Sequence, residues 1–199
     1  MINSLSQYLK TFKLESITLI GPLFKAEDKD LVLPGPVIYI DTDPVDLIGK
    51  GFLVGDGDTS KEKMDLLLDR KKNYSDLSFV LSHIETQFKV IRAFGFLGGR
   101  KDHEFINFGE FFNFLSNRKE TCLQLSPEVM IYSPGNWNIE LKGVFSLLFL
   151  ERCKVKITGD CEYHFDGVSE FSLSSQFLSN KAFGEVKIMS EKSFGVFGS

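Results

Sequence analysis

Hydrophobic positions in the first 116 residues follow two different spacings. Nearly continuous apolar runs, typical of strands that are buried on both faces, occupy residues 16–20, 37–40, 52–54 and 89–96. Segments with an apolar residue every three or four positions, which predict amphipathic helices, occupy residues 61–72, 75–88 and 102–115. Strands that alternate with helices predict an α/β fold with a parallel sheet in three layers, covered by helices on both faces.

Two of these predicted helices have a clear apolar face. The first should begin at an N-cap, Ser75, and bury Leu77, Val80, Leu81, Ile84 and Phe88. The second should bury Phe105, Phe108, Phe112 and Leu115.

The pattern changes near residue 117, after which no convincing helix remains. Short β-rich runs separated by turn residues take over, at residues 121–125, 129–132, 137–141, 144–149, 154–158, 162–165, 170–173, 185–189 and 194–197. Evenly spaced short strands predict an all-β sandwich or jelly-roll-like domain. We therefore expect two domains, an α/β domain over residues 1–118 and an all-β domain over residues 119–199.

Composition narrows the functional classes. The net charge of −4 offers no basic field for nucleic acid, and no apolar run is long enough to span a membrane or to serve as a signal peptide. Three widely spaced cysteines, Cys122, Cys153 and Cys161, form neither a zinc pattern nor a disulfide framework. We expect a cytoplasmic protein with neither a nucleic-acid nor a membrane partner.

A glycine loop follows the apolar run at residues 89–96. Gly98 and Gly99 precede Arg100, Asp102 and His103, and a helical pattern begins at once. Free backbone N–H groups at such a turn suit a phosphate, and an arginine fork would grip its oxygens. The alternative is an ordinary turn with an N-cap at Asp102, and spacing alone favours neither.

An acidic glycine loop follows the run at residues 52–54. It carries Asp56 and Asp58, and Gly57 between them permits a bend that brings both carboxylates to one ion. Carboxylate pairs suit Mg²⁺, although soluble Asp-Gly-Asp turns are also common. Because open α/β sheets bind ligands at the carboxyl ends of their strands, the two loops together suggest Mg²⁺ and a nucleotide.

These segments, in this order, resemble the thiamine pyrophosphokinase family. The matching segments are Gly55-Asp56-Gly57-Asp58-Thr59, Lys72-Asn73-Tyr74-Ser75-Asp76, Gly98-Gly99-Arg100-Lys101-Asp102-His103 with Asn107 beyond it, residues 145–148, residues 159–163 and Leu178-Ser179-Asn180. Each motif is weak alone, but six in order are fairly specific.

The resemblance implies an activity and an assembly. Members of the family have an α/β domain followed by a β-sandwich, and they transfer the pyrophosphoryl group of ATP to thiamine, which yields thiamine diphosphate and AMP. They are homodimers whose site lies where the α/β domain of one subunit meets the β domain of the other.

The resemblance also implies residue roles. Asp56, Asp58 and Asp76 would hold Mg²⁺ and be catalytic, with Asp76 orienting the thiamine hydroxyl. Asp41 would be a further Mg²⁺ ligand, although Asp41 and Asp43 could also be turn residues before Pro44. Gly98, Gly99, Arg100 and Asp102 would bind ATP, together with His103, although a histidine at a helix start is more often structural. Ser179 and Asn180 would line the thiamine pocket.

The sequence departs from the family pattern at several positions. Asp41-Thr42-Asp43-Pro44 replaces a glycine-rich motif, Asn73 replaces an aspartate, and Gly57 replaces an aromatic residue. The connections at residues 21–35 and 41–56 leave room for reduced helices at most. Two alternatives follow: a pyrophosphokinase for another hydroxymethyl acceptor such as a pterin, or an inactive thiamine- or nucleotide-binding protein.

Overall fold

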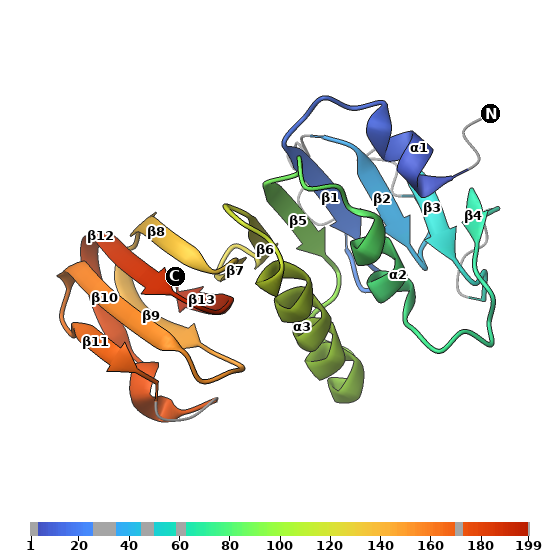
Figure 1. The fold of residues 1–199 in the computed structure, drawn as a ribbon. Coiled ribbons are helices and arrows are strands. Elements are labelled where there is room, and N and C mark those ends of the chain that lie inside the picture. The colour runs from blue at the N-terminus through green and yellow to red at the C-terminus, as the bar shows by residue number, and fades with distance from the viewer. Residues whose placement is uncertain (1–3, 26–34, 45–49, 59–62, 170–172, 199) are drawn as a thin grey trace. The chain divides into compact units, whose positions relative to one another are not determined.

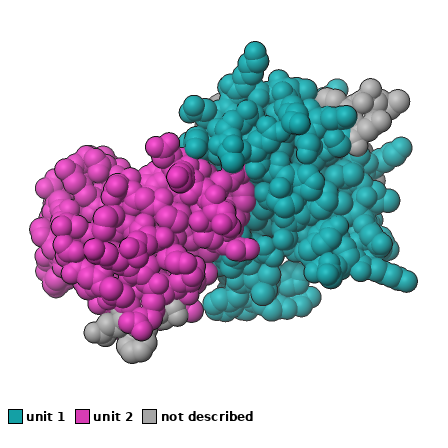
Figure 2. Space-filling view, viewed as in Figure 1, with its two compact units in different colours: residues 1–110 teal, residues 111–199 magenta. Residues whose placement is uncertain are grey.

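The computed structural model describes residues 4–25, 35–44, 50–58, 63–169 and 173–198. The chain forms two compact units, residues 1–110 and residues 111–199, which are coloured separately in Figure 2. The division falls inside helix α3 (Lys101–Ser116). The boundary expected from the sequence, near residue 118, lies beyond the end of that helix and stays a prediction.

Unit 1 contains a parallel sheet. Its strands are β1 (Ser16–Ile20), β2 (Val37–Ile40), β3 (Phe52–Gly55), β4 (Leu66–Leu67) and β5 (Val90–Phe94). They lie in the order β5-β1-β2-β3-β4, and each neighbouring pair is parallel. The carboxyl ends of these strands therefore share one edge of the sheet, where Figure 1 shows the arrowheads.

Two shorter helices accompany the sheet, α1 (Leu5–Lys10) and α2 (Asp76–His83), of which α2 packs against β2 and β3. The hydroxyl of Ser75 accepts a hydrogen bond from the backbone N–H of Ser78 at 2.9 Å, as expected of an N-cap. α2 ends before the predicted residue 88 because Ile84 has an extended backbone, with φ −71° and ψ 117°. That helices cover both faces of the sheet stays a prediction. Of the short connections at 21–35 and 41–56, residues 26–34 and 45–49 lie outside the described residues.

The prediction of a helix at residues 61–72 is wrong from residue 63 onward, where the structure has no helix. Residues 61 and 62 lie outside the described residues. Leu66 pairs with Val54 and Leu67 with Gly55, so the segment adds an edge strand to the sheet. Met64 and Leu68 are buried whereas Leu67 is 68% exposed. This alternation is closer to strand spacing than to helix spacing.

The predicted apolar face of α3 is wrong at Phe105, which is 75% exposed. The buried residues of this helix, Phe111, Phe112 and Leu115, are concentrated in its second half. The N-terminal half therefore leaves Phe105 and its neighbour Ile106 exposed.

Unit 2 is built from strands, as the sequence predicts. They are β6 (Cys122–Ser126), β7 (Val129–Tyr132), β8 (Gly135–Glu140), β9 (Gly143–Leu148), β10 (Lys154–Cys161), β11 (Phe165–Val168), β12 (Asn180–Ser190) and β13 (Phe194–Gly198), with one 3₁₀ turn at Ser175–Phe177. Neighbouring strands pair antiparallel in the order β11-β10-β12-β9-β13-β7-β6. The predicted strand at 170–173 falls on residues of which 170–172 lie outside the description, and Leu173 is in a turn.

The long strand β12 changes partners along one of its edges. Its first residues pair with β9 and its later residues pair with β8, while β10 runs along the other edge. A strand that is shared in this way lets a sheet curl around a core. That core includes Val155, Val186 and Phe194, and Phe194 stacks on Tyr132 with ring centroids 5.3 Å apart.

Within the described residues, no helix is both long enough and apolar enough to cross a membrane. The three cysteines are free thiols.

Candidate functional site

Three carboxylates converge at the carboxyl edge of the unit 1 sheet. Asp41 follows β2 directly, and Asp56 and Asp58 lie in the loop after β3. One oxygen from each lies within 4.8 Å of the others, and Asp41 and Asp56 are partly buried. Negative charges this close repel one another, and a hard cation such as Mg²⁺, which takes oxygen ligands, would relieve the repulsion.

The backbone around Asp41 is unusual. Asp41 has a left-handed φ of 51°, and its N–H donates to the carbonyl oxygen of Val54 at 2.9 Å. A Cβ on Gly55 would lie only 3.1 Å from the Asp41 Cα, so a side chain there would crowd it. Gly55 therefore gives Asp41 the room to lie against the end of β3, a role that sequence reasoning missed.

The loop that carries Asp56 and Asp58 is a tight turn. Gly57 has φ 73°, and the backbone N–H of Asp58 donates to Asp56 Oδ1 at 3.2 Å. This is the bend that the Asp-Gly-Asp spacing predicts.

Asp76 is joined to this cluster through a lysine. Lys72 Nζ lies 2.9 Å from Asp76 Oδ1 and 3.6 Å from Asp56 Oδ2, and the lysine side chain is only 8% exposed. Burial opposes the charged ammonium, but its bonds to Asp76 and Asp56 outweigh that effect and raise the pKa of Lys72. Sequence reasoning assigned no role to Lys72. The residue lies before the N-cap of α2, where the four-residue spacing of helical ion pairs does not apply.

The glycine loop after β5 has the expected backbone. Gly98 and Gly99 have φ of 89° and 66°, and a Cβ on Gly98 would meet no atom within 4 Å. The N–H of Gly98 donates to Glu104 Oε1 at 3.1 Å, and Glu104 Oε2 lies 2.6 Å from Lys101 Nζ. The Gly98 N–H, which was expected to bind a phosphate, thus donates its hydrogen bond to the carboxylate of Glu104.

Arg100 and Asp102 form a bidentate pair in the same loop. Arg100 Nε donates to Asp102 Oδ1 at 3.1 Å and Nη2 donates to Oδ2 at 2.5 Å. These hydrogen bonds lower the pKa of Asp102 to about 2. α3 begins at Lys101, so Asp102 lies within the helix instead of capping it. His103 is exposed, and Asn107 Nδ2 donates to the Phe96 carbonyl oxygen at 2.9 Å.

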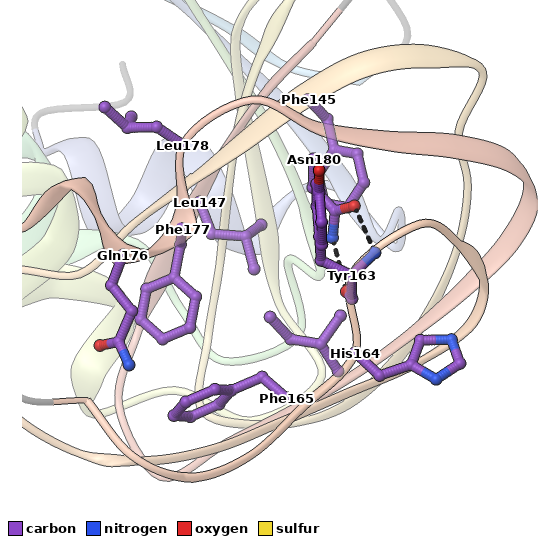
Figure 3. Close-up of a pocket in the computed structure, with 10 residues that line it drawn as sticks. Phe145, Leu147, Tyr163, His164, Phe165, Gln176, Phe177, Leu178 and Asn180 are labelled. Carbon is purple, nitrogen blue, oxygen red and sulfur yellow. Dashed lines mark hydrogen bonds between the residues drawn. The ribbon is translucent and has the colours of Figure 1, made fainter.

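Unit 2 contains a small pocket of about 90 Å³, shown in Figure 3. Its lining is mostly aromatic and aliphatic, with a polar rim, and consists of Phe145, Leu147, Ile157, Tyr163, His164, Phe165, Gln176, Phe177, Leu178 and Asn180. The Phe165 and Phe177 rings meet edge to face at 5.0 Å. Asn180, which was expected to line the thiamine pocket, is one of these residues, and its role toward thiamine stays a prediction.

The side-chain amide of Asn180 forms two hydrogen bonds with the backbone of Tyr163. Its Oδ1 accepts from the N–H of Tyr163 at 3.0 Å, and its Nδ2 donates to the Tyr163 carbonyl oxygen at 2.8 Å, as the dashed lines in Figure 3 show. Oδ1 also accepts from the N–H of Lys181 at 2.8 Å. Asn180 thereby fixes one rim of the pocket.

Ser179 lies outside the residues that line this pocket. It has a left-handed φ of 56°, and its N–H donates to Ser146 Oγ at 3.0 Å. The aromatic rings at positions 145, 165 and 177 were not expected as lining residues.

No family model and no curated protein sequence matches this chain. Solved structures do match over nearly the whole chain. Thiamine pyrophosphokinase from Bacillus subtilis is 19% identical with a TM-score of 0.70, covering 92% of this chain and 99% of that one. The enzyme from Geobacillus thermodenitrificans is 16% identical with a TM-score of 0.69, covering 92% and 97%. Yeast thiamin pyrophosphokinase is 15% identical with a TM-score of 0.65, covering 96% and 88%. The chain therefore has the fold of the thiamine pyrophosphokinases.

Proposed function

We propose that this protein is an ATP- and Mg²⁺-dependent thiamine pyrophosphokinase. The observation that carries the proposal is the convergence of Asp41, Asp56 and Asp58 on one point, at the ligand-binding edge of a sheet in a chain with this fold. Transfer of a phosphoryl-type group needs charge neutralisation and positioning more than covalent chemistry.

The acidic cluster would hold the metal and position the acceptor. Oxygens of Asp41, Asp56 and Asp58 would bind Mg²⁺, which neutralises charge on the transferring phosphates. Asp76 would orient the thiamine hydroxyl, whose oxygen would attack the β-phosphorus of ATP as the bond from that phosphorus to the α-phosphate oxygen breaks. AMP would leave, and the hydroxyl proton would pass to water. Thiamine is a cation, so the acidic cluster would also attract it.

The glycine loop would bind the nucleotide phosphates. The N–H groups of Gly98 and Gly99 would donate hydrogen bonds to phosphate oxygens. The Arg100 guanidinium would exchange its two hydrogen bonds to Asp102 for hydrogen bonds to a phosphate. Before the nucleotide binds, Asp102 would hold the Arg100 guanidinium in position. His103, at the start of α3, would help to order the loop.

The pocket of unit 2 would receive part of thiamine. At about 90 Å³ it is smaller than the pockets that hold a whole drug-sized ligand, so it suits a single ring. Asn180 would shape its rim, and Ser179 would contribute a polar contact nearby. The family resemblance implies that a second copy of the chain completes the site in a homodimer.

A direct assay tests the proposal. Purified protein, ATP, Mg²⁺ and thiamine should give AMP and thiamine diphosphate, with no ADP. Asp56→Asn should lower the rate at least about a hundredfold, because it removes a charged ligand of the Mg²⁺ that would neutralise the transferring phosphates. Asp166→Asn, which removes an exposed partner of Lys156 in unit 2, should leave the rate unchanged. Absence of both products would refute the proposal.

A second candidate is a pyrophosphokinase for another hydroxymethyl acceptor such as a pterin. It is favoured by the segment Asp41-Thr42-Asp43-Pro44, whose left-handed Asp41 stands where the family has glycines. Release of AMP that depends on a pterin and not on thiamine would select it. Binding of thiamine or ATP without turnover would instead indicate an inactive binding protein, an outcome that Asn73 favours.

A further inference from the structure

Lys72 has a largely covered side chain whose ammonium is placed between carboxylates. It lies between β4 and α2, and its side chain is 8% exposed, which is rare for lysine. Its ammonium approaches Asp56 in the loop after β3 and Asp76 in the first turn of α2. One side chain therefore links two segments that are distant in sequence.

We propose that Lys72 is the resident counter-ion of the acidic cluster, a positioning residue that holds Asp56 and Asp76 in place and competes with a divalent cation for Asp56. The identity of that cation rests on the proposed function, but the counter-ion role does not.

The charges explain why such a residue is needed. Asp41, Asp56 and Asp58 place three carboxylates within 4.8 Å of one another. Lys72 neutralises part of this charge from the Oδ2 side of Asp56, while Oδ1 of Asp56 accepts the N–H of Asp58. Without Lys72 and without a metal ion, repulsion between the carboxylates would oppose the folded loops.

The same charge weakens cation binding. A divalent ion bound to Asp56 would lie close to the ammonium, and like charges repel strongly where water is partly excluded. Lys72 thus keeps the loops folded in the absence of metal at the cost of metal affinity. It leaves the cation weakly held until phosphate oxygens add further ligands.

Two measurements on three variants test this role. Free Mn²⁺ is followed by electron paramagnetic resonance during titration of the protein with Mn²⁺ alone, and melting temperature is measured in EDTA and at saturating Mn²⁺. The variants are Lys72→Met, Lys72→Arg and the control Lys71→Met, which removes an exposed charge from the neighbouring position.

Lys72→Met should bind Mn²⁺ about tenfold more tightly than the unmodified chain. It should melt about 3 °C or more lower in EDTA, and saturating Mn²⁺ should remove that difference. Lys72→Arg, which keeps the charge, and Lys71→Met should resemble the unmodified chain in both measurements.

Three results would overturn the inference. One is an unchanged Mn²⁺ affinity and EDTA melting temperature in Lys72→Met. Another is Lys72→Arg behaving like Lys72→Met, which would indicate a packing role. The third is a Lys72→Met chain that stays unfolded at saturating Mn²⁺, since the cation should replace the missing charge.

A failure of the proposed function would look different. If the unmodified chain binds no Mn²⁺, the metal site is wrong, and the EDTA melting temperatures of Lys72→Met and Lys72→Arg still decide the role of Lys72. If they differ as expected, the counter-ion role stands; if they are equal, it falls.

Discussion

At the scale of single residues, the candidate site depends on backbone conformations that ordinary side chains adopt at a cost. Asp41 is left-handed, and it is bonded to Val54 beside a glycine that leaves room for it. A non-glycine residue in this conformation is uncommon and is found often at functional sites. The sequence suggested Asp41 as a ligand, but nothing in it showed that Gly55 makes this position possible, because the two residues meet only when β2 and β3 pair.

Gly55→Ala should disturb the acidic cluster. The added methyl group would lie 3.1 Å from the Asp41 Cα, so the backbone of Asp41 must shift. Affinity for Mn²⁺ should fall about tenfold, measured by titration.

A matched control is Gly109→Ala in α3, where a Cβ would meet no atom within 4 Å. It should leave Mn²⁺ affinity unchanged and raise the free energy of unfolding by about 0.5–1 kcal/mol, because alanine favours a helix. Equal Mn²⁺ affinities in both variants would contradict the role given to Gly55.

Asn180→Asp should destabilise unit 2. The carboxylate cannot donate to the carbonyl oxygen of Tyr163, so two acceptors would face each other in a nearly buried position. The expected loss is about 1–3 kcal/mol of unfolding free energy, measured by urea denaturation. Asn138→Asp, at an exposed position in β8, is the control and should change little; a loss of similar size there would point to a general charge effect.

At the scale of elements, the sequence located most strands of both units and did less well with the helices. The strand predicted at 162–165 is wrong over 162–164, because β11 begins only at Phe165. Continuous apolar runs located β1, β2, β3 and β5, because strands buried on both faces contain few polar residues. The segment before α2 looked helical, yet it pairs with β3 as β4, since an edge strand gains hydrogen bonds that local spacing cannot reveal. Phe105 fitted a helical stripe but is exposed, because periodicity does not show how far along a helix the packing extends.

The start of α3 carries a contact that the motif did not predict. Glu104 occupies the N–H of Gly98 and pairs with Lys101, in the place where the glycine loop was expected to receive a phosphate. Sequence could suggest the Lys101–Glu104 pair from its spacing, but the contact with Gly98 depends on the positive φ of the loop.

Glu104→Gln should therefore tighten nucleotide binding. Loss of the charge would weaken the competing contact and remove repulsion of phosphate, so affinity for ADP should rise about three- to tenfold, measured by calorimetry. Glu110→Gln, later in the same helix, should have no effect. Weaker binding after Glu104→Gln would mean that Glu104 supports the loop instead of competing with the ligand.

At the scale of the whole molecule, unit 2 presents apolar side chains on one face of its sheet. Val144 in β9 lies opposite Lys181 in β12, and Phe183 follows on the same side, with Val144 56% and Phe183 61% exposed. Lys181 Nζ lies 5.6 Å from the centre of the Phe183 ring. The homodimer implied by the family resemblance would bury such a surface.

Phe183→Asp should consequently weaken self-association. Sedimentation should show a dimer for the unmodified chain and a shift toward monomer for this variant, because a charge would replace a buried ring. Leu14→Asp, which changes an exposed apolar side chain just before β1, at the edge of the unit 1 sheet opposite the acidic cluster, should leave the dimer intact. A monomer at all concentrations of the unmodified chain would argue against the second copy.

The order of strands in unit 2 has a consequence for how the chain folds during synthesis. β12 lies between β10 and β9, and β13 lies between β9 and β7, although both follow all the other strands in sequence. β8, which pairs with β12, and β9, which pairs with β12 and β13, therefore emerge from the ribosome before these neighbours exist. Because contacts so distant in sequence form slowly, unit 2 should remain open to proteases and chaperones until β13 has been made, whereas every strand of unit 1 emerges before it.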